Sequence, residues 1–239
     1  MSTLAHLHAG RAMVLKQFEE AIKTTVFNHV DFRLAVVGGG HDEIEIEIIR
    51  KFIGNIKVVS FGIDGTDVYL DLNESDSISN SLHGVFDLII CCQTLEHIWN
   101  LTEAINNLNL LVKQGGHVWV NVPASNMKHG SPDYFSAGYQ SNMLGNLFAL
   151  VGFSSISKGE IGSRRLYLMT HKQRYWPNAQ THKNPFLRGI ESRRYLFILK
   201  FIRYLFKNLE ASFWSAKVAV GSEFSTESWY YGKKINDHA

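Results

Sequence analysis

The 239-residue chain contains only two cysteines, Cys91 and Cys92, which are adjacent within an apolar run. Neighbouring residues of a strand point to opposite faces, so a disulfide between these two is implausible and a reducing compartment is expected. No apolar stretch reaches the length of about 18 residues that a membrane-spanning helix needs. The N-terminal residues also lack the apolar core of a signal peptide, so we expect a cytoplasmic protein.

Charge is scarce and nearly balanced, with 24 Lys and Arg residues against 22 Asp and Glu. The net charge of +2 gives no overall electrostatic case for nucleic acid, and no nucleic-acid partner is expected. Internal repeats and low-complexity tracts are absent. Hydrophobic residues, in contrast, make up 45% of the chain, which suffices for a full-sized core and excludes a disordered chain.

Apolar segments of strand length alternate with segments of helical periodicity over most of the chain. This alternation predicts an α/β fold, namely a Rossmann-like, doubly wound, mainly parallel seven-stranded sheet with an antiparallel closing strand. The expected strands are 34–38, 57–64, 68–72, 86–92, 117–122, 153–157 and 164–170, of which the last two form an antiparallel pair. The expected helices are 4–29, 42–53, 100–113 and 138–151, although alternating isoleucines in 42–53 are also compatible with a strand.

The sequence divides into an N-terminal helix within 1–30, a main domain at 31–170 and an extension at 171–239. The extension begins as an irregular linker and contains a basic and aromatic helix at 191–210. Three interpretations of that helix stay open. It can pack on its own domain or on a second subunit, lie at the inner face of a membrane, or contact nucleic acid.

Doubly wound sheets bind ligands beyond the carboxyl ends of their strands. The first of these loops is Gly38-Gly39-Gly40, where glycines let a ligand approach the backbone and the next helix offers free N–H groups. A tight strand-to-helix turn is the alternative. Glu43 stands where a dinucleotide fingerprint needs its third glycine, and the charges of Asp42 and Glu43 favour a ligand with an ammonium group over one with a pyrophosphate.

Two aspartates follow the next strands. Asp64 closes the second strand, where a carboxylate can accept both hydroxyls of a ribose. Asp71 ends the third strand, and its carboxylate can accept a hydrogen bond from the amino group of an adenine. Each is equally compatible with an ordinary turn or cap aspartate.

The segment 86–123 resembles the second half of a class I S-adenosylmethionine-dependent methyltransferase domain. The resemblance lies in an Asp-hydrophobic strand, then Leu95-Glu96-His97, a helix, the turn Lys113-Gln114-Gly115-Gly116, and a strand that ends at Pro123. The segment 129–153, which opens on His-Gly and continues to Asp133-Tyr134, resembles a stretch of a subgroup often associated with surface-glycan biosynthesis.

The resemblance implies S-adenosylmethionine as cofactor. Gly38 and Gly40 match the glycine loop that contacts the methionine part, and Asp64 matches the ribose acid. Asp71 matches the acid on the adenine side, and Gln93 matches the end of the fourth strand beside the transferred methyl group.

Transfer of a methyl group to a hydroxyl requires an aligned acceptor and a group that takes its proton. His97 and His129 are the candidate catalytic bases, since both lie on loops at the expected end of the sheet. For His97, a role in capping or orienting the next helix is an equal alternative. Asp133 and Tyr134 are the candidate acceptor-binding residues. The remaining histidines are scattered, so we predict no metal site.

The resemblance therefore implies an S-adenosylmethionine-dependent O-methyltransferase of polysaccharide biosynthesis. Its partner would be a small-molecule or glycan acceptor, with 191–210 contacting a membrane or a second subunit. A non-catalytic scaffold is the first alternative, because Val36 replaces an acidic residue of the family's loop and Asp42 replaces a glycine. A nicotinamide-dependent oxidoreductase is the second, and Glu43 argues against it.

Overall fold

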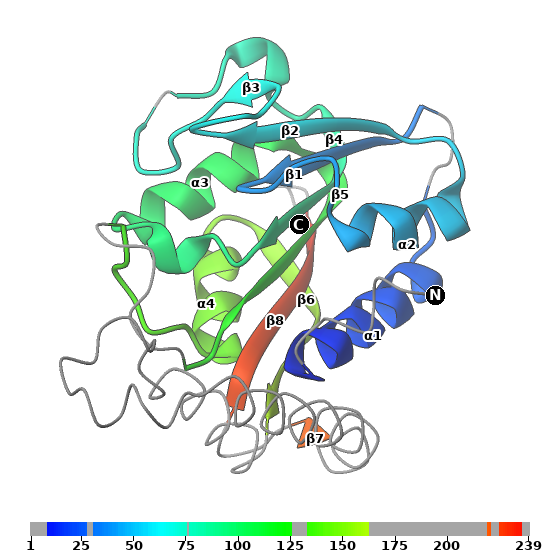
Figure 1. Cartoon of the computed structure of the whole chain (residues 1–239). Coiled ribbons are helices and arrows are strands. Elements are labelled where there is room, and N and C mark those ends of the chain that lie inside the picture. The colour runs from blue at the N-terminus through cyan, green and yellow to red at the C-terminus, as the bar shows by residue number, and fades with distance from the viewer. Residues whose placement is uncertain are drawn as a thin grey trace, which may run out of the picture.

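The computed structural model describes residues 9–27, 31–75, 77–125, 133–162, 219–220 and 225–235. Its centre is one eight-stranded sheet with the order β3-β2-β1-β4-β5-β8-β6-β7 (Figure 1). The strands are β1 Arg33–Val37, β2 Lys57–Gly62, β3 Val68–Tyr69, β4 Phe86–Cys92, β5 Val112–Pro123, β6 Phe153–Gly162, β7 Ala219–Val220 and β8 Ser225–Lys234. Neighbours from β3 to β5 pair in parallel, whereas β8 is antiparallel to β5 and β6, and β7 is antiparallel to β6. The predicted doubly wound, mainly parallel sheet is confirmed.

Helices cover both faces of this sheet. The helices are α1 Ala9–Thr24, α2 Ile44–Ile53, α3 Leu101–Leu111 and α4 Ser141–Leu150, with short 3-10 turns η2 Asn80–Leu82 and η3 Leu95–His97. α1 and α2 lie on one face, and α3 and α4 on the other (Figure 1). Alternate residues of the central strands fill the two cores, so that Val36 packs toward α1 and α2 while Val37 packs toward α3 and α4.

The ambiguous segment 42–53 is a helix, as expected. Ile46, Ile49 and Ile53 are buried at helical spacing, and the burial of each side chain contributes about 1.5–3 kcal/mol to the free energy of folding. Acidic residues occupy the first turn and Arg50 and Lys51 the last, which complements the helix dipole. The alternating isoleucines that favoured a strand are therefore the residues of one helical face and its margin.

The closing strand comes from the far end of the chain. β8, which lies in the segment that the sequence analysis assigned to the extension, pairs with β6 from Phe153 to Gly162. It is inserted between β5 and β6, so both of its edges are paired. Helices cover its two faces, with Trp229 and Tyr231 packed toward α1 and Tyr230 stacked on Phe148 of α4. Burial of these three aromatic residues stabilises the long-range strand, which the sequence analysis did not predict. Residues 164–170 and 191–210 lie outside the described residues.

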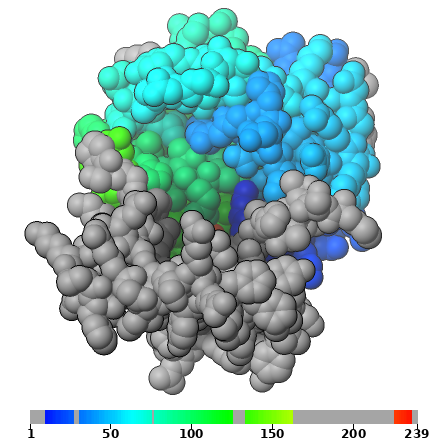
Figure 2. All heavy atoms as spheres, in the orientation of Figure 1, coloured from blue at the N-terminus to red at the C-terminus, as the bar shows by residue number. Residues whose placement is uncertain are grey.

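One edge of the sheet gathers residues from both ends of the chain. β1, β2, β4 and β5 end there, and β8 begins there, since Glu227 is the register partner of Pro123. Dark-blue atoms of α1 also lie against green atoms of the central strands in the space-filling view (Figure 2). This edge is where a doubly wound sheet binds its ligand.

Candidate active site

The glycine loop after β1 is built against the end of β4. Gly38 has a φ of +77°, its N–H donates to the carbonyl of Phe61 at 2.8 Å, and a Cβ at this position would lie 2.2 Å from Thr94 Oγ1. Glycine at 38 is therefore required by the fold itself. Among the described residues, a Cβ at Gly40 would meet only Asp42 Oδ1, at 3.0 Å, so they leave this part of the loop open to a ligand.

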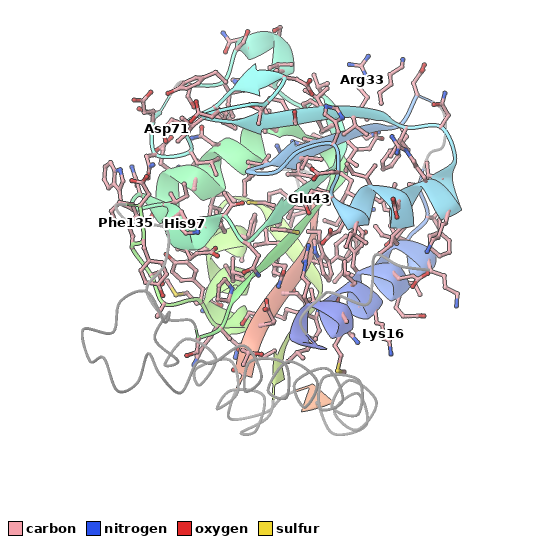
Figure 3. The ribbon with its side chains drawn as sticks, viewed as in Figure 1. Lys16, Arg33, Glu43, Asp71, His97 and Phe135 are labelled. Atoms are coloured by element: carbon pink, nitrogen blue, oxygen red, sulfur yellow. The ribbon has the colours of Figure 1, made fainter. Side chains whose placement is uncertain are left out.

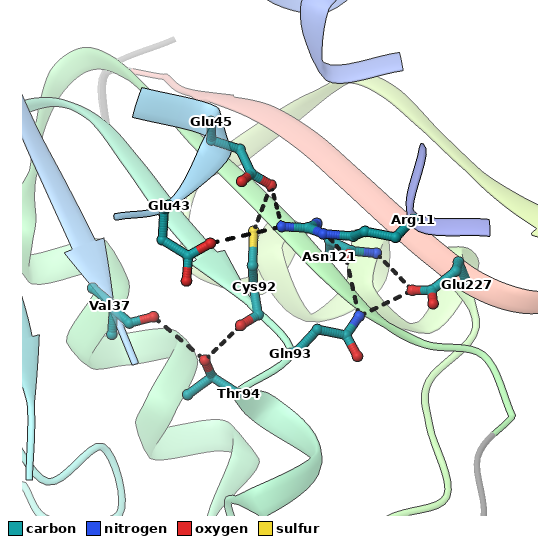
Figure 4. Close-up of polar contacts among 9 residues, drawn as sticks. All are labelled: Arg11, Val37, Glu43, Glu45, Cys92, Gln93, Thr94, Asn121 and Glu227. Atoms are coloured by element: carbon teal, nitrogen blue, oxygen red, sulfur yellow. Dashed lines mark hydrogen bonds and ion pairs between the residues drawn. The ribbon is translucent and has the colours of Figure 1, made fainter. Parts of the chain in front are cut away.

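Gln93, expected beside the transferred methyl group, lies at the centre of a polar network (Figure 4). It follows β4 with a φ of +54°, a backbone conformation that is uncommon for a residue other than glycine. Its Nε2 donates to Asn121 Oδ1 at 3.0 Å and to Glu227 Oε2 at 2.9 Å. Asn121 Nδ2 donates to the same Glu227 oxygen at 3.2 Å and to the carbonyl of Ser228 at 2.9 Å. The ends of β4, β5 and β8 are thereby joined through side chains.

Arg11 brings the N-terminal helix into this network. Its Nη1 donates to Asn121 Oδ1 at 2.7 Å, and its Nη2 lies 2.6 Å from Glu45 Oε1 and 3.8 Å from Glu43 Oε2 (Figure 4). Glu45 is fully buried, and its Oε2 has no hydrogen-bond partner within the described residues. Burial raises the pKa of Glu43. The cluster thus combines one arginine with several carboxylates, a set that suits a ligand carrying both a carboxylate and an ammonium group.

Cys92 is held in the same cluster. Its Sγ donates to Glu45 Oε1 at 3.3 Å, and burial raises the pKa of this thiol well above its usual value. Cys91 is buried on the opposite face, and both cysteines are free, as expected for adjacent residues of a strand. Cys92 is therefore a protonated hydrogen-bond donor at neutral pH and has no thiolate character.

Glu227, like Arg11, is a residue of this edge that sequence reasoning missed. Burial raises its pKa to about 7, although hydrogen bonds from Asn121 and Gln93 and the charge of Arg11 act in the other direction. A carboxyl group with such a pKa exchanges protons at physiological pH. Only its register opposite Pro123 reveals it, because the local sequence Ser-Thr-Glu-Ser matches no motif.

His97 lies in η3 and holds the segment that contains Asp133 and Tyr134. Its Nδ1 is 2.5 Å from the carbonyl oxygen of Asp133, and its ring centroid is 6.3 Å from that of Tyr134. The main-chain N–H groups of Phe135 and Ser136 both donate to the carbonyl of Glu96, at 3.0 and 3.1 Å. Figure 3 shows His97 and Phe135 close together at this edge. The structure thus brings His97, Asp133 and Tyr134 together, whereas His129 lies outside the described residues.

The contact with Asp133 fixes the tautomer of His97. A carbonyl can only accept, so the neutral ring carries its proton on Nδ1 and a lone pair on Nε2. Nε2 lies 3.9 Å from Glu96 Oε1. His97 therefore orients the 133–136 segment through its Nδ1, while its Nε2 faces the buried carboxylate of Glu96.

Asp71 and Asp64 occupy the other strand ends. Asp71 Oδ1 accepts hydrogen bonds of 2.9 Å from the backbone and side-chain nitrogens of Asn73, whose own oxygen accepts from Trp99 N at 3.0 Å. This connects Asp71 to the end of η3, and Figure 3 shows Asp71 on the same side of the molecule as His97. Asp64 is exposed in the turn after β2.

The structural role in the turn after β2 belongs to Asp67. Its Oδ2 accepts from Ser60 N at 2.8 Å and Ser60 Oγ at 2.9 Å and contacts His41 Nε2 at 2.7 Å. These bonds from Ser60 and His41 lower the pKa of Asp67 to about 2. Since Asp67 stabilises the turn, the exposed carboxylate of Asp64 is available for the ribose contact that the sequence predicts.

The comparisons with known proteins agree with this architecture. A family model described as a methyltransferase domain matches residues 33–182. The chain belongs to this methyltransferase domain family. Comparison with curated proteins gives no match. The match spans the glycine loop, Gln93 and the His97 segment, and S-adenosylmethionine, the cofactor expected from the sequence, accords with it. The open side of Gly40, the exposed Asp64 and the mixed charges around Arg11 fit this molecule.

Several solved structures share the fold of this methyltransferase-family chain. One is a chain of the complex between the Haloferax volcanii Trm112 methyltransferase activator and a methyltransferase, with a TM-score of 0.50, 11% identity, and coverage of 97% of this chain and 96% of that one. The [4+2]-cyclase SpnF gives a TM-score of 0.51 at 14% identity, covering 95% and 84%. A SAM dependent methyltransferase from Archaeoglobus fulgidus gives 0.50 at 13% identity, covering 94% of each chain. Because one of these proteins is a cyclase, the fold alone does not determine the reaction.

Two kinds of feature are absent from the described residues. They contain no helix of sufficient length and hydropathy to cross a membrane. The same part of the chain holds no cluster of three or more His, Cys, Asp or Glu residues that could ligate a metal ion.

Proposed function

We propose that this chain transfers a methyl group from S-adenosylmethionine to a hydroxyl of a sugar or similar small polar acceptor. The observation that carries the proposal is the meeting, at one edge of the sheet, of the glycine loop, Gln93 and the His97–Asp133 contact. S-adenosylmethionine supplies a methyl group on a positively charged sulfur. The chain has to hold this cofactor, align the acceptor with the methyl carbon and take up the acceptor's proton.

Five residues are proposed to line the cofactor. Gly38 and Gly40 shape the loop at the methionine part, Asp64 accepts the ribose hydroxyls, Asp71 lies on the adenine side, and Gln93 lies beside the methyl group. The acidic residue that the family has at position 36 is a buried valine here, packed toward α1 and α2. The carboxylate of Glu43, which is partly exposed, lies on that same face and supports cofactor binding without an acid at 36.

The acceptor is proposed to bind over the 133–136 segment. Asp133 is exposed and Tyr134 half-buried, so a carboxylate and an aromatic ring are offered together, as a sugar requires for its hydroxyls and its apolar face. His97 positions this segment through its bond to Asp133 and, with His129, is a candidate base. Neutral Nε2 of His97 is the atom that would take the proton.

The cellular setting is part of the same proposal. A reaction on surface-glycan precursors would place the chain in the cytoplasm, and the basic and aromatic sequence at 191–210 would contact the inner membrane face or a second subunit. Vesicles with and without anionic lipid test the membrane contact, because an electrostatic contact would be lost with neutral lipid and in high salt.

Radiolabelled methyl transfer tests the reaction. Purified protein would be incubated with S-[methyl-³H]adenosylmethionine and nucleotide sugars, lipid-linked glycans, small amines and small thiols in parallel. Label on a hydroxyl compound alone supports the proposal. Label on an amine or thiol contradicts the O-methyl assignment, and label on no compound by a protein that also fails to bind cofactor favours the non-catalytic scaffold.

A further inference from the structure

We propose that Glu227 is a further catalytic residue, whose carboxylate receives the proton of the acceptor hydroxyl as the methyl group is transferred. The inference rests on the proposed function and adds to it a residue that neither the family's motifs nor the sequence pattern assigns.

The position of Glu227 follows from the strand that carries it. β8 begins at the edge where β4 and β5 end, and Glu227 is the register partner of Pro123, the last residue of β5. Its side chain faces the same side of the sheet as Trp229 and Tyr231, toward α1. A residue near the C-terminal end of the chain is thereby placed among the strand ends that bind the ligand.

The two carboxylate oxygens of Glu227 have different surroundings. Oε2 accepts from Gln93 Nε2 at 2.9 Å and from Asn121 Nδ2 at 3.2 Å, which fixes the orientation of the group. Oε1 has no hydrogen-bond partner within the described residues, and the side chain is half-buried. One oxygen is thus held in place while the other remains available to a substrate proton, the arrangement that a general base needs.

The bond to Gln93 places this carboxylate near the reacting centre. Gln93 is the residue proposed beside the transferred methyl group, and its φ of +54° directs it away from the regular path of β4. Because Glu227 and Gln93 are in direct contact, an acceptor oxygen aligned with the methyl carbon would lie close to Glu227 Oε1. Figure 4 shows the contact and the arginine beside it.

The protonation of Glu227 is set by groups on every neighbouring element. Burial raises its pKa to about 7, Glu96 adds to this increase, and Arg11 of α1 opposes it. Part of the charge of Arg11 is already neutralised by Glu45 and Glu43 at the start of α2. Cys92, the remaining titratable group of the cluster, is itself protonated. Glu227 is therefore ionised above neutrality and protonated below it.

The proposed step is balanced. The acceptor oxygen forms a bond to the methyl carbon while the carbon–sulfur bond breaks, and the pair of electrons from that bond stays on sulfur to give neutral S-adenosylhomocysteine. The hydroxyl proton passes to Glu227 Oε1 and is later released to solvent. No oxidant, reductant or metal ion is required.

Cofactor binding tests the placement without knowledge of the acceptor. An ionised Glu227 beside the reacting centre attracts the sulfonium of S-adenosylmethionine but not the uncharged sulfur of S-adenosylhomocysteine. Calorimetry would give the ratio of their Kd values at pH 6 and pH 8 for the wild type, for Glu227→Gln, and for Glu20→Gln, which removes an exposed carboxylate of α1. Protonation of the ligands themselves affects all three proteins equally, so a difference between the proteins reports on Glu227.

Between pH 6 and pH 8, the preference for S-adenosylmethionine over S-adenosylhomocysteine should increase in the wild type and in Glu20→Gln. We expect this increase to be about 3–10-fold larger than in Glu227→Gln. Equal pH responses in all three proteins would overturn the assignment of Glu227 and leave the proposed function standing. Absence of binding of both ligands to the wild type would overturn the proposed function and this inference together.

Turnover gives the second readout, with whichever acceptor the radiolabel screen identifies. In the wild type kcat/KM should fall as the pH drops below about 7, and Glu227→Gln should lower kcat by about 10²–10⁴-fold, far more than the change of about 3–10-fold expected in its affinity for S-adenosylmethionine. Glu227→Asp, which keeps the carboxylate, should recover part of the rate. If Glu227→Gln keeps full turnover and the wild-type pH profile, Glu227 is not the base, and that role is assigned to His97 or His129.

Discussion

Arg11, in the first turn of α1, donates a hydrogen bond of 2.7 Å to the side-chain oxygen of Asn121 in β5. The same guanidinium lies 2.6 Å from the buried carboxylate of Glu45. The N-terminal helix is therefore tied to the ligand-binding edge by a largely buried ion pair as well as by its apolar face. This contact makes the stability of the site depend on a residue outside the region that the family model matches.

Removal of Arg11 should be strongly destabilising. Arg11→Met leaves Glu45 buried without its counter-ion, which costs about 3–5 kcal/mol of unfolding free energy. Addition of Glu45→Gln to the same chain should recover more than half of this loss, because the unpaired charge is then gone. Urea denaturation of both variants measures the effect, with exposed Lys16→Met of the same helix as control. A loss below 1 kcal/mol would contradict the buried ion pair.

The glycine loop offers a contrast between two neighbouring positions. Gly38→Ala should lower the unfolding free energy by about 2 kcal/mol or more, since its φ is +77° and the new Cβ would collide with Thr94. Gly40→Ala meets only Asp42 and should leave stability within about 1 kcal/mol of the wild type while weakening cofactor binding. Thermal melts and calorimetry separate the two effects. Equal stability losses would show that position 40 is constrained by the fold as well.

Glu227 and His117 should give opposite dependences of stability on pH. The pKa of Glu227 is raised to about 7 by burial, so the folded protein binds this proton more tightly than the unfolded chain and loses stability as the pH rises from about 4.5 to 7. The pKa of His117 is lowered to about 4 by burial, with Lys233 and Lys113 adding to the effect. The folded protein then gains stability as the pH rises from about 4 to 6.5.

These two contributions offset each other in the wild type, so single variants should separate them. The unfolding free energy of Glu227→Gln, taken relative to the wild type, should increase by about 1–3 kcal/mol between pH 5 and pH 7. That of His117→Gln, taken in the same way, should decrease by a similar amount. Urea titrations at pH 5, 6 and 7 give the slopes. Parallel curves for all three proteins would contradict both pKa shifts.

His97 should control the order of the acceptor segment. His97→Ala removes the bond to the Asp133 carbonyl, so amide hydrogen exchange at 133–136 should accelerate by at least about tenfold while exchange in α3 is unchanged. A positioning role alone raises KM for the acceptor, whereas a role as base lowers kcat. His97→Asn, which can still donate to the carbonyl, is the matched variant. It should restore protection if orientation is the function, and unchanged exchange in His97→Ala would refute the contact.

Local sequence sufficed where a short segment carries its own signal. The isoleucines of α2 recur at helical spacing, β4 is a continuous apolar run typical of a strand buried on both faces, and the position of Gln93 at a strand end follows from that run. β8 could not be predicted in this way, because its place between β5 and β6 depends on pairing across more than 100 residues. Arg11 and Glu227 were missed for the same reason. Each becomes a site residue through long-range contacts, among them a hydrogen bond with Asn121, which no spacing in the sequence reveals.

Calorimetric titration with S-adenosylhomocysteine, with NADH in parallel, tests the central claim most directly. The account predicts micromolar binding of S-adenosylhomocysteine, no heat from NADH, and weaker binding by Gly40→Ala and Asp64→Asn than by the Glu20→Gln control. Binding of NADH alone, or of neither ligand by folded protein, would contradict the assignment of this edge as a methyl-donor site.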